Sequence, residues 1–127
     1  MSSRKQARRT ALTLLYQWDL TGQPLASLHA GEVDPFATAL AQNVIDRAEQ
    51  LDARISDVSG DWPAERLGVV ERTALRMAIV ELDDGEVPRE VAINEAVALA
   101  KRFSSQEAAK LVNGILGRIA QDLQETR

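Results

Sequence analysis

Apolar residues recur at intervals of three and four along most of this chain, and this spacing limits the folds that it can adopt. An α-helix places residues three and four apart on one face, whereas a β-strand needs strict alternation. The sequence has no convincing alternating stretch, and it is rich in alanine and leucine, which favour helices. We therefore expect an all-α protein, a compact bundle of about five principal helices joined by short turns.

Capping residues and helix breakers locate these helices. Ser3 and Gln6 have the spacing of a capping box, and Asp34-Pro35 has the pattern of an N-cap followed by proline at the first helical position. Glycines and paired serines mark helix ends and restarts. These signals predict helices from Ser3 to just before Gly22, from Asp34 to Gly60, over residues 70–82 and 91–103, and after Ser104-Ser105 to a short polar tail.

Composition excludes several classes of protein. A chain of 127 residues with 45% hydrophobic and 27% charged residues is expected to form a single domain over residues 1–127. It has no cysteine, so it has no disulfide and no thiolate nucleophile. No apolar run approaches the roughly 18 residues that cross a bilayer. We expect a cytoplasmic protein without a membrane segment.

Signals of catalysis, metal binding or cofactor binding are weak. The single histidine, His29, has no serine-acid or metal-ligand spacing around it, and we expect it to be a solvent-exposed loop residue. The acidic run Asp83, Asp84 and Glu86 lacks the spacing of a calcium loop and is typical of a turn that ends a helix. Residues 114–117 match a glycine-x-x-glycine clamp, but close helix packing is the favoured interpretation there. We expect no metal, no cofactor and no enzymatic activity.

One basic segment contrasts with the acidic chain. The net charge is -4, yet the first ten residues contain no acid and the four cations Arg4, Lys5, Arg8 and Arg9. On a helical wheel with Arg4 at zero, the other three fall at about 40°, 100° and 140°, and Tyr16 falls at about 120°. Trp18 turns towards the core. Cations beside an aromatic ring suit an unpaired RNA strand, because they hold phosphates while the ring stacks on a base.

Two other interpretations of this segment remain open. The cations can be a solvated helix end, although basic residues are unfavourable at a helix N-terminus because of the helix dipole. The first 18 residues also resemble an organelle-targeting presequence, because they are basic, contain serine and threonine and lack acids. The apolar stripe that continues through Trp18 argues against a presequence, because its removal would take a wall from the domain.

Two stretches of the sequence resemble the NusB family. The first is the arginine-rich segment from Arg8 to Trp18, which contains the aromatic pair Tyr16 and Trp18. The second lies in the C-terminal half and matches in order and spacing: Val70-Glu71-Arg72, Leu75-Arg76-Met77-Ala78, Val87-Pro88, Val91-Ala92-Ile93-Asn94-Glu95-Ala96-Val97 and Val112-Asn113-Gly114-Ile115-Leu116. Residues 21–59 carry little identifying sequence.

The resemblance implies a transcription antitermination factor that binds the boxA element, a single-stranded RNA, together with the ribosomal protein NusE. It also implies assembly with other Nus factors on RNA polymerase, chiefly during ribosomal RNA synthesis. The RNA-binding residues that it implies are Arg4, Lys5, Arg8, Arg9, Tyr16, Glu107, Lys110 and Leu111. At the last of these positions the family often has an aromatic residue, which this chain lacks. Glu65 and Glu71 match acidic positions that contact the ribosomal protein, and an ion pair with a basic partner is physically reasonable.

Other motif residues are interpreted as structural. Asn94 and Asn113 sit among apolar neighbours, which favours buried amides that brace the core. Arg76 is expected to bridge helices rather than to bind RNA. Two further functions remain as alternatives: a homodimeric interaction module with a masked RNA face, and the N-terminal domain of a ribosomal RNA cytosine methyltransferase. The second is disfavoured because 127 residues leave no room for a catalytic domain.

Overall fold

The computed structural model describes residues 3–60 and 64–125, and every regular element in these ranges is helical. The elements are α1 (Arg4–Thr21), η1 (Leu25–Ser27), α2 (Pro35–Asp46), α3 (Ala48–Ser59), η2 (Ala64–Arg66), α4 (Val69–Asp84), α5 (Arg89–Phe103) and α6 (Gln106–Glu125), where η denotes a 3-10 helix. The expected all-α fold is confirmed. The described ranges contain six α-helices, however, rather than the five expected from the sequence.

Both ends of α1 have the chemistry that the sequence predicts. Ser3 Oγ accepts a hydrogen bond from the Gln6 backbone N–H at 3.2 Å, and Gln6 Oε1 accepts one from the Ser3 N–H at 3.3 Å. This reciprocal pair is a capping box, which satisfies donors that the first helical turn leaves free. Gly22 follows the helix with φ 69°, a left-handed conformation that glycine adopts without a Cβ clash.

The expected second helix is in fact two helices, because the chain bends at Arg47. This residue has φ -111° and ψ 11°, and its guanidinium donates to Asp83 of α4 at 2.5 Å. Neither glycine nor proline marks the bend, and the apolar spacing continues across it from Val44 to Leu51. The cause is tertiary: α2 packs mainly on α1 and α4, whereas α3 packs on α6, η2 and α4. Because of the bend, the apolar stripe packs on α1 and α4 before Arg47 and on α4, α6 and η2 after it.

The remaining helix boundaries largely follow the predicted signals. Asp34 Oδ1 accepts from the Phe36 N–H at 2.8 Å and caps α2. Gly85, with φ 69°, ends α4. Ser105 Oγ accepts from the Ala108 N–H at 3.0 Å and restarts the chain as α6.

The end of α4 carries an ion-pair cluster. Arg47 and Arg54 both donate to Asp83 Oδ2, at 2.5 and 2.6 Å. Burial of this carboxyl favours its neutral form, but the hydrogen bonds and charges of the two guanidiniums outweigh burial and lower the pKa of Asp83 below its usual range. Asp83 and Asp84 belong to the last turn of α4 before Gly85, as a helix-ending signal predicts. Within residues 3–60 and 64–125, no three acidic or histidine side chains gather as a metal site.

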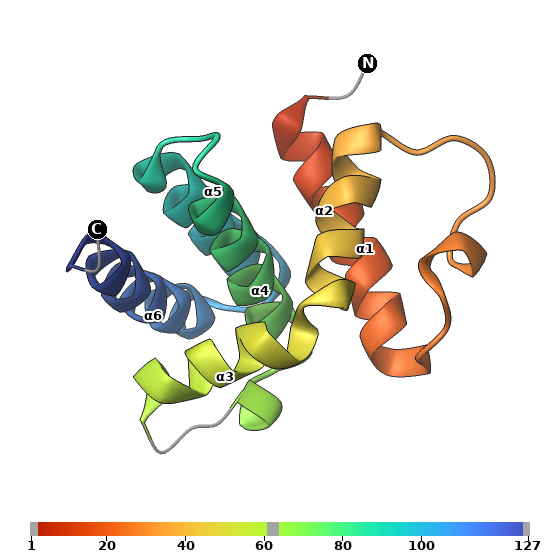
Figure 1. Ribbon diagram of the computed structural model, residues 1–127. Coiled ribbons are helices and arrows are strands. Elements are labelled where there is room, and N and C mark those ends of the chain that lie inside the picture. The colour runs from red at the N-terminus through yellow and green to blue at the C-terminus, as the bar shows by residue number, and fades with distance from the viewer. Residues whose placement is uncertain (1–2, 61–63, 126–127) are drawn as a thin grey trace.

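Helix α4 lies at the centre of the fold. Its residues 73–82 are all buried, and it touches every other α-helix. Figure 1 shows α1 and α2 side by side on one flank, α5 and α6 on the other, and α3 crossing between the flanks at one end. One cluster of buried apolar residues extends through all six α-helices. Residues that are distant in sequence, such as those of α1 and α5, are therefore held in fixed places around α4.

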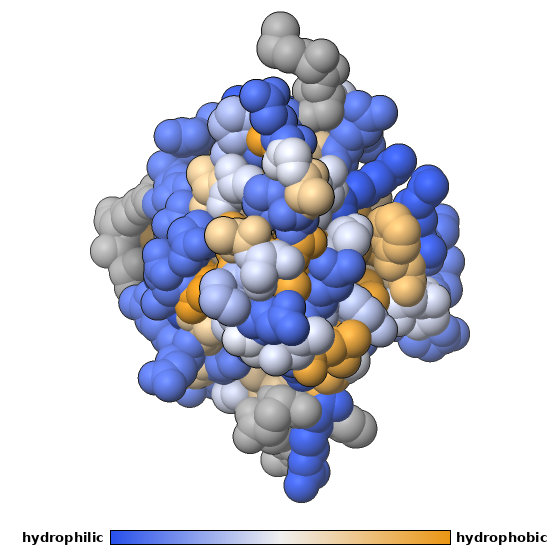
Figure 2. All heavy atoms as spheres, turned by 90° about the vertical axis from the view of Figure 1, so that its right-hand side faces the viewer, coloured by the Kyte–Doolittle hydropathy of each residue, from blue (hydrophilic) through white to orange (hydrophobic). Residues whose placement is uncertain are grey.

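The outer surface is largely polar on the face that carries α1, α2 and their connection. Figure 2 shows small, separate hydrophobic patches among hydrophilic side chains there. His29 lies in this connection and is half-buried rather than exposed as expected, with Nδ1 3.3 Å from the Gly31 carbonyl oxygen. No helix in the described ranges is long and apolar enough to cross a membrane.

Two expectations about α5 and α6 are wrong. Asn94 and Asn113 are exposed, so neither is a buried amide that braces the core. Their apolar neighbours in sequence turn inward, and the helical period turns the asparagines outward. Gly114 and Gly117 are exposed too, and a Cβ added to either would meet no atom within 4 Å. These glycines do not serve close helix packing.

Candidate nucleic-acid interface

The four N-terminal cations lie on two sides of α1 rather than on one face. Arg4 and Arg8, one helical turn apart, point to Phe36 of α2 and Glu81 of α4. Lys5 and Arg9 lie against α5 instead. On the helical wheel the two pairs are about 100° apart, and α1 packs on α2 and α4, so that Arg4 and Arg8 face these helices while Lys5 and Arg9 face the side chains of α5.

Arg8 belongs to the core, and the expectation that it joins an exposed RNA face is wrong. Its side chain donates from Nε to Glu81 Oε2 at 3.0 Å and from Nη2 to Glu81 Oε1 at 2.7 Å. Only 3% of Arg8 and 7% of Glu81 is exposed. The hydrogen bonds to Glu81 raise the pKa of the Arg8 guanidinium against the opposing effect of burial. Sequence pattern missed this role because Glu81 is 73 residues away.

Arg4 is exposed, but its guanidinium packs on an aromatic ring. Its guanidinium carbon lies 4.0 Å from the centre of the Phe36 ring, and that of Arg8 lies 5.6 Å from the same centre. Both distances fall within the range of cation–π attraction. Arg4 therefore faces away from the cations that remain available on the α5 side.

The second pair of cations opens onto a small cleft between α1 and α5. Lys5 Nζ lies 3.2 Å from Glu95 Oε1, and 65% of the lysine side chain is exposed. This α1–α5 cleft is lined by Lys5, Arg9, Glu95, Ala98, Leu99 and Arg102. Three cations and one carboxylate give it a net positive lining.

Arg102 is the cleft residue that sequence reasoning missed. Basic residues in the last turn of a helix are favourable to the helix dipole, so Lys101 and Arg102 have an ordinary local explanation. Only packing of α5 against α1 shows that Arg102 shares the cleft with Arg9. Its guanidinium carbon also lies 5.4 Å from the centre of the Phe103 ring. The sequence signal that could have indicated Arg102 is a cation next to an aromatic residue, Phe103, at the end of the helix that contains the 91–97 motif.

An apolar groove continues from the cleft along α1. The α1–α4 groove is lined by Leu12, Thr13, Tyr16, Gln17, Leu20, Thr21, Val70 and Phe103. Three of its large side chains are open to solvent, with Tyr16 41%, Leu20 61% and Phe103 46% exposed. The helical wheel predicts that Tyr16 shares one face with all four cations, but it lines the groove next to the cleft of Lys5 and Arg9, away from the side of Arg4 and Arg8. Trp18 packs partly buried against the core, as expected.

A third hollow lies between η2 and the start of α6. The η2–α6 depression is lined by Arg66, Leu67, Gly68, Glu71, Ser105, Glu107, Ala108 and Leu111. It brings Glu107 and Leu111, expected at the RNA, together with Glu71, expected at the protein partner. Lys110 is exposed on α6 but does not line the depression. The side chain of Glu65, also expected at the partner, lies outside the described part of the chain.

Glu71 has a close neighbour in the η2–α6 depression. It is half-buried, and its carboxylate lies so near Gly68 that a Cβ on the glycine would overlap it. Gly68 is the N-cap of α4 and Glu71 is its third residue. A negative charge is favourable there because the backbone N–H groups of the first turn point towards it.

The three hollows are adjacent and change in character along their length. Arg102 of the cleft is followed by Phe103 of the groove, and Val70 of the groove is followed by Glu71 of the depression. A basic cleft can hold phosphates, and exposed rings can stack on bases. An open apolar groove beside carboxylates can hold a protein with apolar and basic side chains. The arrangement therefore suits a nucleic acid at one end and a protein at the other.

Comparison with known proteins agrees with the sequence motifs. The sequence model of the NusB family matches residues 5–121. The transcription antitermination protein NusB of Rubrobacter xylanophilus is 44% identical over 121 residues, which covers 90% of this chain and 87% of that protein. A chain in a crystal structure of a plectonemic RNA supercoil has a TM-score of 0.88 and 30% identity, with all of both chains covered. A crystal structure of antitermination factors NusB and NusE in complex with dsRNA has a TM-score of 0.81 and 31% identity, and covers 94% of this chain and 96% of that chain.

Proposed function

Because the chain belongs to the NusB family, we propose that it is a transcription antitermination factor that binds boxA-type RNA together with NusE. The whole chain acts as one RNA-binding domain in the cytoplasm and catalyses no reaction. With NusE it joins other Nus factors on RNA polymerase and supports ribosomal RNA transcription. The observation that carries the proposal is the gathering of Lys5, Arg9 and Arg102 at one cleft beside two exposed aromatic rings.

The proposed RNA surface is narrower than the sequence alone indicates. Lys5, Arg9 and Arg102 supply the phosphate contacts, and Tyr16 and Phe103 offer faces on which unpaired bases stack. Arg8 is excluded because its donors are held by Glu81. Arg4 makes at most a peripheral contribution because it points to Phe36 of α2 and does not line the cleft.

The proposed protein surface consists of the Leu20 end of the α1–α4 groove and the η2–α6 depression. The exposed Leu20 gives it an apolar part, and Glu71 and Glu107 give it negative charge. A basic ribosomal protein fits this combination, because apolar contact supplies affinity and opposite charge speeds association. The structure of NusB, NusE and dsRNA noted above is a precedent for a similar chain. A basic partner also offsets the net charge of -4, which repels RNA.

Fluorescence anisotropy of labelled boxA RNA tests the RNA surface. Lys5→Ala, Arg9→Ala and Arg102→Ala are each expected to weaken binding and to lower the slope of log affinity against log salt by about 0.7 to 1. Arg118→Ala, which removes an exposed cation of α6 at the α3–α6 side, is the matched control and is expected to change neither. Scrambled RNA tests whether binding depends on the sequence, and duplex RNA tests whether it requires a single strand. A triple cleft variant with the wild-type slope would contradict the proposal.

The same titration repeated with NusE tests the protein surface. NusE is expected to tighten RNA binding by the wild-type chain. Glu71→Lys is expected to weaken NusE binding while leaving binding of RNA alone within about twofold, since the charge reversal lies at the other end of the site. Sedimentation of the free protein distinguishes this partner from a second copy of the chain. A stable homodimer that NusE does not dissociate would contradict the assignment of the groove.

A further inference from the structure

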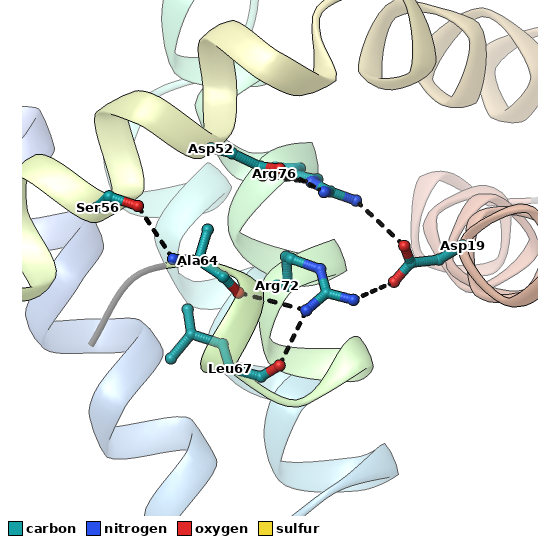
Figure 3. Close-up of polar contacts among 7 residues, drawn as sticks. All are labelled: Asp19, Asp52, Ser56, Ala64, Leu67, Arg72 and Arg76. Atoms are coloured by element: carbon teal, nitrogen blue, oxygen red, sulfur yellow. Dashed lines mark hydrogen bonds and ion pairs between the residues drawn. The ribbon is translucent and has the colours of Figure 1, made fainter.

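Arg72 occupies a position from which one side chain reaches both parts of the proposed protein surface. It is the α4 residue directly after Glu71, and its side chain is 13% exposed. Nη1 donates to the carbonyl oxygens of Leu67 at 2.9 Å and of Ala64 at 3.3 Å. Nη2 donates to the carboxylate of Asp19 in α1. Figure 3 shows the guanidinium between the η2 backbone on one side and Asp19 on the other.

The acceptors of Arg72 adjoin residues that line two different hollows. Asp19 precedes Leu20 and Thr21, which form a wall of the α1–α4 groove. The carbonyls that Arg72 holds belong to Ala64, the first residue of η2, and to Leu67, which follows η2. Arg66 and Leu67 form a wall of the η2–α6 depression. The guanidinium thereby fixes the end of α1 and the η2 turn relative to the same turn of α4.

Neighbouring contacts brace each side but do not replace this connection. Ser56 Oγ accepts from the Ala64 N–H at 3.0 Å and ties η2 to α3. Arg76 makes a two-bonded pair with Asp52, at 2.7 Å for each bond, and its Nη1 lies 4.0 Å from Asp19. Among the hydrogen bonds of these described residues, Arg72 makes those that join Asp19 to the η2 backbone (Figure 3).

The chemistry of arginine suits this role. A guanidinium is planar and carries five N–H donors in fixed directions, so it can hold a carboxylate and two carbonyls at once. A lysine ammonium keeps the charge, but it is a compact point charge and cannot span the same three acceptors. Arg72→Lys therefore removes the geometry while it preserves the charge.

We propose that Arg72 is a positioning residue for the protein partner: it sets the α1–α4 groove and the η2–α6 depression at the spacing that one partner protein needs to contact both. This inference rests on the proposed binding of NusE. Arg72 itself touches neither the partner nor the RNA. It acts through Leu20 on one side and Leu67 on the other.

The test compares two arginine-to-lysine variants of the full chain. Arg72→Lys is expected to weaken NusE binding, measured by calorimetry, about tenfold, which corresponds to loss of about one hydrogen bond to a charged group. Its affinity for RNA alone is expected to stay within about twofold, since the α1–α5 cleft keeps its residues. The control is Arg47→Lys, because Arg47 makes a partly buried ion pair with Asp83 at 2.5 Å away from both hollows. It is expected to lower the melting temperature without changing NusE binding.

A second variant removes only one side of the connection. Asp19→Asn leaves Arg72 on the η2 carbonyls, and it is expected to weaken NusE binding by less than Arg72→Lys does. If Arg72→Lys does not fold, NusE binding by Asp19→Asn is the measurement that tests the inference. Wild-type NusE affinity in both variants overturns this inference alone. A loss of NusE affinity in Arg47→Lys equal to that in Arg72→Lys also overturns it, because general destabilisation then explains the effect. No NusE binding by the wild-type chain overturns the proposed function as well.

Discussion

An arginine serves folding or binding according to the group that lies opposite it. Arg8 and Arg9 are adjacent in sequence, yet Arg8 is 3% exposed and paired with Glu81, whereas Arg9 lines the α1–α5 cleft. A guanidinium leaves water at low cost only when a carboxylate satisfies its donors, and removal of that carboxylate leaves an unpaired charge. Arg8 therefore serves the fold as the partner of Glu81, and Arg9 is available to a ligand.

A double-mutant cycle on the Arg8–Glu81 pair tests this assignment. Arg8→Met and Glu81→Leu alone are each expected to lower the free energy of unfolding by about 3 to 5 kcal/mol, because each leaves a buried charge unpaired. The double variant is expected to recover most of that loss. Urea unfolding followed by circular dichroism gives the values, and Arg9→Met, expected within about 0.5 kcal/mol of wild type, is the control. Losses that simply add in the double variant would show that the two side chains are not coupled.

The helices divide into features that local sequence determines and features that it does not. The capping box at Ser3 and the left-handed glycines at Gly22 and Gly85 are short-range chemistry, and the sequence predicts them. The bend at Arg47 has no local signal, because it depends on α2 and α3 packing on different helices. Periodicity continues through it and predicts one long helix.

The candidate interface divides in the same way. Lys5, Arg9 and Tyr16 lie on one helix, so a helical wheel places them on one side, and the structure agrees. Arg102 comes from α5 and Arg8 pairs with α4, so neither fact is visible before the helices are packed. Sequence predicts a binding stripe within an element, but not its width or the residues that other elements add.

The exposed glycines of α6 give a prediction about helix stability. Gly114 and Gly117 lie within the helix, and a Cβ at either position meets open space. Gly114→Ala and Gly117→Ala are each expected to raise the free energy of unfolding by about 0.5 to 1 kcal/mol, because alanine loses less backbone freedom on folding. Gly85 also has open space around it, but its φ is 69°.

Gly85→Ala is therefore the matched control for the α6 glycines. It is expected to destabilise the chain by about 1 kcal/mol, since only its backbone conformation disfavours a side chain. Thermal unfolding of the three single variants makes the comparison. Destabilisation by Gly117→Ala would mean that α6 does not keep this helical geometry in solution.

Helix α4 makes the two flanks of the protein depend on each other. It contacts α1 and α2 on one flank and α5 and α6 on the other, and the buried apolar cluster is continuous across it. Two ion pairs strengthen the connection of α4 to α1, from Arg8 to Glu81 and from Arg72 to Asp19. The α1–α5 cleft has one wall on each flank, so its geometry exists only when both flanks are folded.

Cooperative unfolding of the entire chain follows from this arrangement. A Trp62→Phe variant leaves Trp18 of α1 as the only tryptophan, and its fluorescence reports on the α1–α2 flank. Far-ultraviolet circular dichroism reports on all helices together. The two urea transitions are expected to coincide in midpoint and slope, because loss of either flank exposes the apolar residues of α4. A fluorescence transition at clearly lower urea would show that α1 and α2 unfold as a separate unit, and the proposal of a single domain would then fail.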